Sequence, residues 1–307
     1  MPARIVKQNR EIKELFRKKI QEKIERQKRE MHERINEEVP SWIRWAVRPL
    51  AEWRFNAVQA RDEAKGEGGE DNAFLHFWLL LSNSWVIVND VVLEPEPNEF
   101  AQIDHVLIGP PGIFLVETKA WEGAFLGYKD MWKRKEGNSW VRCESPTKQN
   151  LRHKRLFADW LKGLGSDLPG DLENNIFPVV LFTRCQWLKA EECSMPVFNN
   201  GAGLVGYLRR CAKEKATFSP DQIEQVAKAL SDAKPLCMHF GVECMEKVEI
   251  QRGKKCIRVL GLEEKAALVR EMYINRGRTV SRLFSDKREV GWWCFYVLPG
   301  QSQKKYC

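Results

Sequence analysis

The sequence predicts an α/β protein with a mixed sheet, extended by a long basic helix at the N-terminus and a small α+β region at the C-terminus. Three observations support this fold class. Helical and strand-like patterns follow one another between residues 70 and 183 in the order α-β-β-β-α-β, which is typical of a mixed sheet flanked by helices. Pro110, Pro111 and Gly112 separate two apolar runs with strong turn chemistry. Residues 5–38 are highly charged and carry a helical apolar period.

The segment 5–38 is predicted to form one long helix that ends at Pro40. Its apolar positions are mostly four or seven apart, which fits a coiled-coil seam or a helix lying on another surface. The next stretch, 41–55, interleaves Trp with Arg and suits lipid headgroups or nucleic acid, although packing on its own domain or on a second copy is the favoured interpretation. The apolar stripe consists of Ile5, Ile12, Phe16, Ile20, Ile24, Met31 and Ile35.

The remaining elements are predicted from their periodicity and turn residues. We expect a helix at 70–82, strands at 85–93, 101–109 and 113–121, a loop rich in Trp, Gly and Lys up to 145, a helix at 146–164 and a strand at 176–183. Further on we expect helices at 204–212, 220–230 and 263–274, a hairpin at 248–260 and a buried strand at 292–298. The chain is therefore divided into a helical arm (1–64), a central domain (65–232) and a C-terminal extension (233–307).

Charge and composition restrict the class of protein. The net charge is +8, and residues 1–50 hold 14 Lys and Arg against 8 Glu, so a basic arm joins a nearly balanced body and predicts a polyanionic partner. No apolar run reaches the roughly 18 residues of a membrane span, and the charged N-terminus does not resemble a secretory signal, so we expect a cytoplasmic protein. The nine cysteines form no CxxC pair, which favours reduced thiols over a zinc site.

Three charged residues lie within the predicted strands at 101–109 and 113–121. Glu117 and Lys119 share one strand face about 6.6 Å apart, because side chains alternate along a strand. If Pro110 and Pro111 form a two-residue turn, Asp104 lies opposite Glu117 with Cβ atoms about 5 Å apart. A three-residue loop would instead place Thr118 there.

Two carboxylates at this separation repel unless a cation lies between them. Mg²⁺ accepts one or two carboxylates and leaves its other positions to water and phosphate, and Lys119 can stabilise charge that develops on phosphate. The alternative is a surface salt bridge from Glu117 to Lys119 with Asp104 at a strand edge. Charges inside strands of Ile, Val, Leu and Phe favour the metal site, since such charges need a partner.

The stretch 102–123 resembles the signature of the nuclease-related domain (NERD), a branch of the PD-(D/E)xK nuclease superfamily. The resemblance covers 66–210, is most specific around the hairpin, and implies an αβββαβ restriction-endonuclease-like core. The zinc-binding tail often joined to this family is not visible. The matching positions are Gly69, Glu70, Ile103, Asp104, His105, Gly112 through Glu117 to Lys119, Trp121, Gly123, Pro146 and Gln149.

The resemblance implies roles for individual residues. Asp104 and Glu117 resemble metal ligands and Lys119 the catalytic lysine. Glu70 resembles a helix acid that assists metal binding, although an acid in a first helical turn is also explained by the helix dipole. Gln149 resembles a helix Gln that supports the site, or is a polar residue in an exposed turn. His105 faces the other side of its strand and is predicted to be structural.

By this resemblance the protein is expected to be a deoxyribonuclease that uses Mg²⁺ or Mn²⁺, with DNA favoured over RNA. The alternative is an inactive nucleic-acid-binding or scaffold protein; retention of Asp104, Glu117 and Lys119 favours the enzyme. Defence against foreign DNA and DNA processing are both compatible by analogy alone. We expect self-association through the N-terminal helix, with peripheral membrane contact less favoured because its charges are mixed.

Basic residues near the predicted centre are candidate phosphate contacts. Lys148, Arg152 and Arg155 are spaced i, i+4 and i+7 and share one side of the helix predicted at 146–164. Lys133 and Arg134 lie in a stretch with interleaved Trp, which also suits nucleic acid. A solvated helix face is the alternative for some of these residues.

Overall fold

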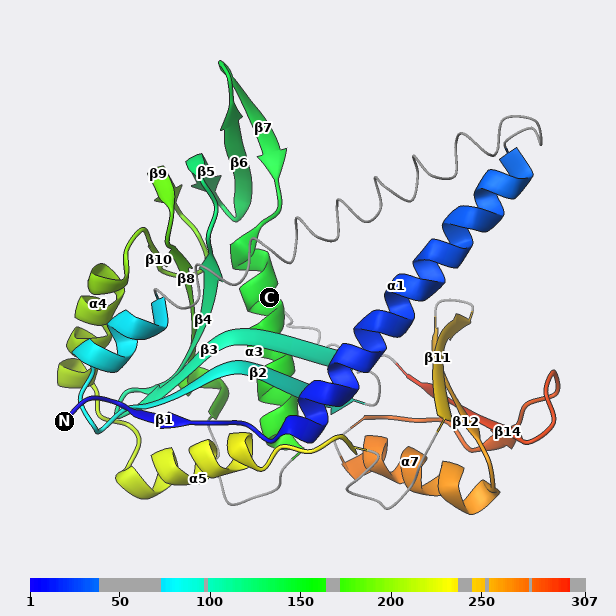
Figure 1. The fold of residues 1–307 in the computed structure, drawn as a ribbon. Helices are drawn as coiled ribbons and strands as arrows, with labels where there is room; N and C mark the ends of the chain where they lie inside the picture. The colour runs from blue at the N-terminus through cyan, green and yellow to red at the C-terminus, as the bar shows by residue number, and fades with distance from the viewer. Residues whose placement is uncertain are drawn as a thin grey trace, which may run out of the picture. The chain divides into compact units, whose positions relative to one another are not determined.

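A six-stranded mixed sheet with strand order β1-β2-β3-β4-β8-β10 is the main framework of this computed structural model (Figure 1). Strands β3 and β4 are antiparallel, and β4 and β8 are parallel. A helix over residues 73–80 precedes β2, and α3 precedes β8, so the predicted mixed sheet and the order α-β-β-β-α-β are confirmed. The elements are β1 (Arg4–Val6), β2 (Val86–Glu96), β3 (Glu99–Gly109), β4 (Gly112–Lys119), α3 (Pro146–Lys162), β8 (Ile176–Phe182) and β10 (Val197–Phe198).

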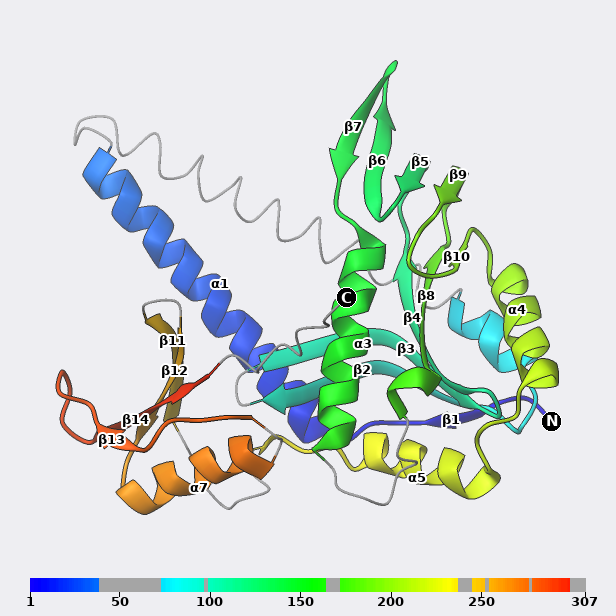
Figure 2. The same cartoon turned by 180° about the vertical axis from the view of Figure 1, so that it is seen from behind.

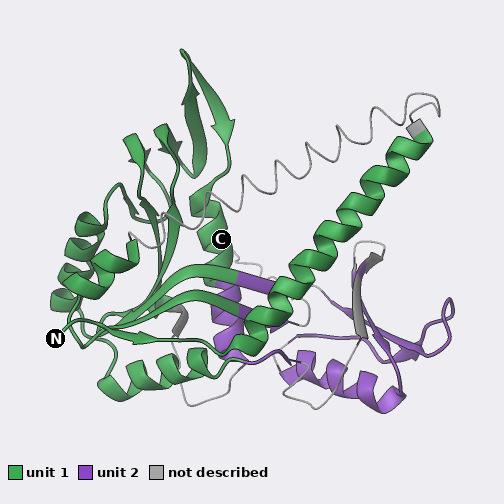
Figure 3. Cartoon of the chain, in the orientation of Figure 1, with its two compact units in different colours: residues 1–92, 102–154, 168–233 green, residues 93–101, 155–167, 234–307 purple. Residues whose placement is uncertain are grey.

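The structure describes residues 1–38, 73–96, 99–163, 172–236, 245–251, 254–275 and 278–298. They fall into two units (Figure 3): the first comprises 1–92, 102–154 and 168–233, and the second 93–101, 155–167 and 234–307. Glu70, Pro40 and the Trp-containing stretch 41–55 lie outside the described residues. Within them, no helix is both long enough and apolar enough to cross a membrane.

The turn between β3 and β4 has the two-residue form on which the predicted register depended. Gly109 pairs with Gly112, and the pairing continues to His105↔Val116. Gly112 has φ +137°, and a Cβ there would lie 2.5 Å from the carbonyl oxygen of Asn175. A side chain at this position would therefore be strained as well as crowded, so the turn requires glycine.

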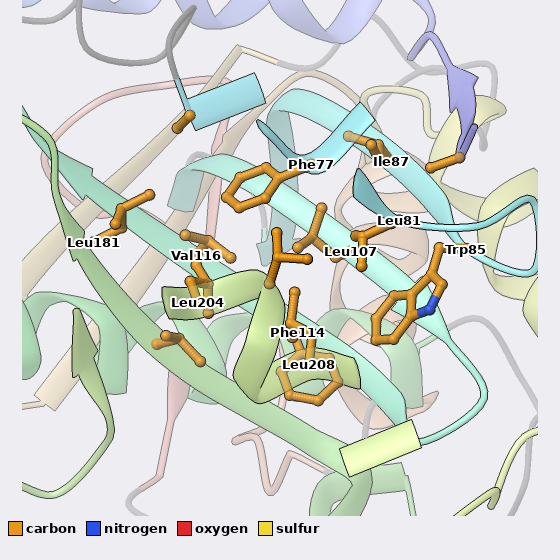
Figure 4. Packing of buried hydrophobic residues seen from close by; sticks show 14 residues of the cluster. Phe77, Leu81, Trp85, Ile87, Leu107, Phe114, Val116, Leu181, Leu204 and Leu208 are labelled. Atoms are coloured by element: carbon orange, nitrogen blue, oxygen red, sulfur yellow. The ribbon is translucent and has the colours of Figure 1, made fainter. Parts of the chain in front are cut away.

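Helices cover the two faces of the main sheet (Figures 1 and 2). On one face, Phe77 of the helix at 73–80 and Leu204 and Leu208 of α4 (Gly201–Glu214) pack with Phe114 and Val116 of β4 in one apolar cluster (Figure 4). On the other face lies the part of α3 that belongs to the first unit, residues 146–154, where Asn150 donates to the carbonyl oxygens of Leu115 and Val179 (Figure 2). Alternation along β4 therefore directs Val116 into the apolar cluster and Glu117 towards α3.

A second sheet replaces the loop that was predicted up to residue 145. Its order is β7-β6-β5-β9. The prediction was wrong because two tight turns were not recognised. Lys129 and Asp130 both have positive φ between β5 and β6, as a type I′ hairpin turn requires, and Gly137 with φ +55° lies between β6 and β7. The strands are β5 (Gly123–Tyr128), β6 (Met131–Glu136), β7 (Ser139–Cys143) and β9 (Cys185–Glu191).

The N-terminal segment is not a single helix from residue 5. Residues Arg4–Val6 form β1, which pairs in parallel with β2, and helix α1 spans Arg10–Glu38. The side chain of Asn9 accepts a hydrogen bond from the N–H of Glu11 at 3.0 Å, and the buried Gln8 side chain bonds both the N–H and the carbonyl of Val92. These contacts hold residues 8 and 9 outside the helix, because hydrogen bonds from side chains to the backbone compete with the backbone hydrogen bonds of a helix.

The second unit contains a four-stranded sheet of order β11-β12-β14-β13 and helix α7 (Glu263–Asn275). The predicted hairpin, helix and last strand are confirmed. Ile257, Val259, Tyr273 and Phe295 form its apolar cluster. Strand bounds are β11 (Met245–Gln251), β12 (Lys254–Leu260), β13 (Phe284–Ser285) and β14 (Trp292–Val297); α5 (Pro220–Ser231) belongs to the first unit and confirms the helix predicted at 220–230.

Candidate active site

The candidate site lies where β4 leaves β3. The β3–β4 pairs reach His105↔Val116, whereas β4 pairs with β8 as far as Lys119↔Phe182. At this point the N–H of Thr118 donates to the Asp104 carboxylate oxygen Oδ2 at 2.7 Å. The Asp104 carboxylate is therefore bonded to the backbone of the residue next to Glu117, although the strand pairs end at His105 and Val116, one position before the predicted pair of Asp104 and Glu117.

Glu117 is a buried carboxylate between two basic side chains. It is 2% exposed, with the Lys119 Nζ 2.6 Å from its Oε1 and the His153 Nδ1 3.2 Å from its Oε2. Burial alone would raise the pKa of Glu117, but His153 and the positive charge of Lys119 outweigh burial and hold that pKa below its ordinary value. Glu117 is therefore an anion at neutral pH, as a metal ligand must be.

Lys119 is held in place from three sides. Besides Glu117, its Nζ donates to Oε1 of Gln149 at 3.0 Å and lies 5.7 Å from the ring centroid of Trp121. The Lys119 side chain is 16% exposed, so its ammonium group remains accessible from solvent. The structure therefore brings Glu117, Lys119 and Gln149 together.

Helix α3 contributes two residues that the sequence analysis did not identify. Asn150 is fully buried and donates from Nδ2 to the carbonyl oxygens of Leu115 at 2.9 Å and Val179 at 2.8 Å, which fastens α3 to β4 and β8. His153 is 6% exposed and contacts Glu117. The available signal was helical spacing, because residue 153 is one turn beyond Gln149 and shares its side of the helix.

His105 lies on the reverse face, as predicted. It is 1% exposed, its Nδ1 lies 2.9 Å from Oδ1 of Asn89, and its ring meets Phe77 edge-on with 5.4 Å between centroids. Burial lowers the pKa of His105 to about 4, so the imidazole is neutral at pH 7. These contacts are those of a structural histidine.

The donor set fits a hard divalent cation. Asp104 and Glu117 supply carboxylate oxygens, and Oε2 of Glu117 is buried without a hydrogen bond although His153 is near. Among the described residues no group of three or more His, Cys, Asp and Glu surrounds one point. Mg²⁺ commonly binds proteins through only one or two carboxylates and completes its shell with water and phosphate, so two suffice.

The predicted nucleic-acid contacts lie on two elements. Lys148, Arg152 and Arg155 are all exposed along α3. Lys133 and Arg134 are exposed on β6 but point to opposite faces of the strand. Arg134 forms an ion pair with Glu136, which offsets its charge.

Comparison with known proteins finds a matching family for the part of the chain that holds this site. Residues 65–183 match the family described as nuclease-related domain (NERD). An uncharacterized protein of Bacillus anthracis is 29% identical over 99 residues, which are 32% of this chain and 46% of that protein. The chain thus spans less than half the length of this relative. No solved structure matches the chain.

Proposed function

We propose that the nuclease-related domain of this chain hydrolyses phosphodiester bonds of DNA with Mg²⁺ or Mn²⁺. The observation that carries the proposal is the buried Glu117, paired with Lys119 at 2.6 Å, next to a backbone N–H bound by Asp104. Burying a carboxylate and an ammonium group is expensive, and a hydrophobic pair would stabilise a sheet as well. Their retention inside an otherwise apolar sheet supports a chemical role.

Asp104 and Glu117 would hold the metal, with Glu70 as a further candidate that lies outside the described residues. When bound, the metal supplies Lewis-acid stabilisation of phosphate oxygens and a water of lowered pKa. Lys119 provides a fixed positive charge for the negative charge that develops on phosphate in the transition state. Gln149 keeps this charge in place through its hydrogen bond to Nζ, so little rearrangement is needed during the reaction.

DNA would approach this centre over a basic surface of α3. Lys148 and Arg152 are exposed on either side of Gln149 in the sequence, and Gln149 itself bonds Lys119. Cations at these positions can neutralise phosphates on both sides of the bond to be cut. Their removal is expected to weaken binding of every DNA sequence alike, because phosphate contacts carry no base information.

The test is cleavage of plasmid, linear duplex and single-stranded DNA by the full chain, with Mg²⁺, Mn²⁺ or EDTA. We expect cleavage with either metal, none in EDTA, and a loss on the order of a hundredfold or more for Lys119→Met, the size seen when a charge-stabilising donor is removed. Lys213→Met, at an exposed position of α4, is the matched control and should cleave like the wild type.

Equal cleavage by the wild type and Lys119→Met would refute the proposed centre. DNA binding without any cleavage in either metal would instead favour the rival function, a nucleic-acid-binding or scaffold protein with a nuclease-like fold. An RNA substrate in the same series separates deoxyribonuclease from ribonuclease activity.

A further inference from the structure

The sheet β7-β6-β5-β9 has one covered and one open face. On the covered face Phe125 and Trp132 are buried and pack with Phe182, whose ring stacks on Trp132 with 5.3 Å between centroids. The side chains on the other face alternate with these and point away from this cluster. Figure 1 shows β6 and β7 as a hairpin that extends beyond β5 and β9. This outer side is the open face.

A row of cations crosses the open face. Cross-strand pairs connect Arg142 to Lys133, Lys133 to Leu126, and Leu126 to Lys189, one residue from each of the four strands. The three basic side chains are exposed. Since directly paired residues point to the same side of a sheet, the row places three positive charges on one surface.

Two tryptophans lie beside this row. Trp140 pairs with Lys135 in β7 and β6, and Trp187 pairs with Ala124 in β9 and β5. Each is two residues along its strand from the cation row, a spacing of about 6.6 Å. Although they come from the two edge strands, their ring centroids lie 5.8 Å apart, with 49° between the ring planes. The small side chain of Ala124, which pairs with Trp187, leaves room for the rings on this face.

These aromatic rings are unusually open for tryptophan. Trp140 is 37% exposed and Trp187 is 46% exposed, while the Lys135 Nζ lies 5.9 Å from the Trp140 ring centroid. Large apolar side chains are normally covered in a folded protein, and an exposed aromatic set among cations is a candidate binding surface. The open face also carries Glu191, which is paired with Lys189 at 3.1 Å.

We propose that the open face binds a single strand of DNA, with bases stacked on Trp140 and Trp187 and phosphates on Arg142, Lys133 and Lys189. Proteins that bind single strands combine a basic track with aromatic rings on which bases stack. A duplex hides the faces of its bases in its own stack, so it could use the cations but not the tryptophans. The proposal names the form of DNA presented to the nuclease centre, and in that respect rests on the proposed function.

Arg142 of the open face also lines a cavity of about 310 Å³ at the foot of the β6–β7 hairpin, together with Lys148 of α3. Asp130 and Glu144 line the same cavity, so its charge is mixed. Lys148 precedes Gln149, which bonds Lys119. A strand held at Arg142 would therefore reach the first turn of α3, next to the residue that holds the candidate catalytic lysine.

The experiment measures binding of a fluorescent 20-nucleotide single strand and of the matching duplex by anisotropy, in EDTA so that no metal-dependent cleavage occurs. For the full chain carrying Trp140→Ala and Trp187→Ala, we expect a loss of about tenfold or more in single-strand affinity, as for removal of base-stacking side chains. Duplex affinity should change by less than about twofold, because only phosphate contacts act there. Val141→Ala is the matched control, since Val141 lies between the two rows on the opposite face of β7 and is 39% exposed.

Two further variants secure the interpretation. The double variant Trp140→Phe with Trp187→Phe retains aromatic rings and should recover most of the single-strand affinity. A folding defect in the alanine variant would instead lower the affinity for single strand and duplex alike. Lys133→Gln should lower the slope of log affinity against log salt by about 0.7 for a single strand, as expected for one lost phosphate contact.

Unchanged single-strand affinity in the alanine variant would overturn the proposal, as would equal losses for single strand and duplex. Binding to phosphatidylserine vesicles that is lost in the alanine variant while DNA binding persists would assign the open face to a membrane surface instead. The proposed function is tested separately. If single-strand binding depends on the tryptophans but no cleavage follows in Mg²⁺ or Mn²⁺, the nuclease function is refuted and the single-strand binding site is retained.

Discussion

Two buried charge clusters in this chain differ in how completely their polar atoms are satisfied. In the second unit, Arg258 donates from Nε to Asp286 at 2.6 Å, from Nη1 to Glu249 at 2.7 Å and from Nη2 to Glu289 at 2.9 Å. In the first unit, Glu117 has Lys119 on one oxygen, but its Oε2 has no hydrogen bond, although Nδ1 of His153 lies 3.2 Å away.

The difference separates a structural cluster from a reactive one. Burial alone would raise the pKa of Asp286, but hydrogen bonds from Arg288 and the charge of Arg258 lower it to about 2. Asp286 is therefore ionised and paired with these two arginines. Arg258 has a partner on each of its three nitrogens, and its guanidinium also lies 4.8 Å from the ring centroid of Trp292. Glu117, by contrast, keeps a buried oxygen that a cation can bind. A buried acid that keeps an oxygen without a hydrogen bond, next to an ammonium group held in place by its neighbours, is the arrangement expected of a site.

The largest expected effect is on the structural cluster. Arg258→Met should destabilise the protein by about 3–5 kcal/mol, because it leaves the buried Asp286 without the cation it is paired with. Urea unfolding measures this loss. Arg288→Met is the control: Arg288 is 57% exposed, so solvent screens its ion pairs and their loss should change the free energy of unfolding little. Equal losses of stability for Arg258→Met and Arg288→Met would show that the cluster does not stabilise the fold.

Glu117→Gln tests the reactive cluster with an isosteric change. The cleavage rate in Mg²⁺ should fall on the order of a hundredfold or more, because an amide is a far poorer ligand for a hard cation and no longer carries the anionic charge. Its stability should change much less than that of Arg258→Met. Glu192→Gln, at an exposed acid of the same unit, should cleave normally. If Glu117→Gln destabilises the protein but the folded variant cleaves normally, Glu117 has a structural role. The two clusters would then not differ in function.

His105 marks the boundary of the reactive cluster on the reverse face of the sheet. Its pKa is lowered by burial to about 4 from 6.5, so its contribution to stability is present above pH 6.5 and is lost as the pH falls towards 4. Between pH 7 and pH 5 the wild type should lose about 2 kcal/mol that His105→Gln does not lose. Urea unfolding at both pH values measures the difference. Identical pH slopes for the two proteins would mean that His105 titrates normally.

The smallest expected effect concerns the N-terminal helix. Because β1 pairs with β2 and Ile12 is fully buried, the base of α1 belongs to the first unit, and truncation of the arm would damage the sheet. A point change is the better test of self-association. Ile20 is 40% exposed on the apolar stripe, and Ile20→Glu should convert a dimer to a monomer in light scattering. Equal masses for the wild type and this variant would contradict self-association through the stripe.

The elements that could be predicted are those encoded over short distances. Pro110, Pro111 and Gly112 indicated a turn, and the alternation in β4 assigned Glu117 and Lys119 to one face. The hairpin of β6 and β7 had a signal too, since Gly137 and Asn138 are typical turn residues that were read as part of a loop. The turn of Lys129 and Asp130 had none, because both adopt positive φ without glycine.

The sequence by itself determined that Glu117 and Lys119 share one face of β4, because side-chain alternation acts between near neighbours. It left the register of the β3–β4 hairpin open between a two-residue turn and a three-residue loop, and the structure decided for the two-residue turn. Only the tertiary structure decided which partners meet Glu117 and Lys119. His153 and Asn150 reach β4 from a helix more than thirty positions away in the sequence, after packing against the sheet. Trp140 and Trp187 likewise meet only because β7 and β9 belong to one sheet. Contacts over such separations depend on how whole elements pack, and no local pattern specifies that.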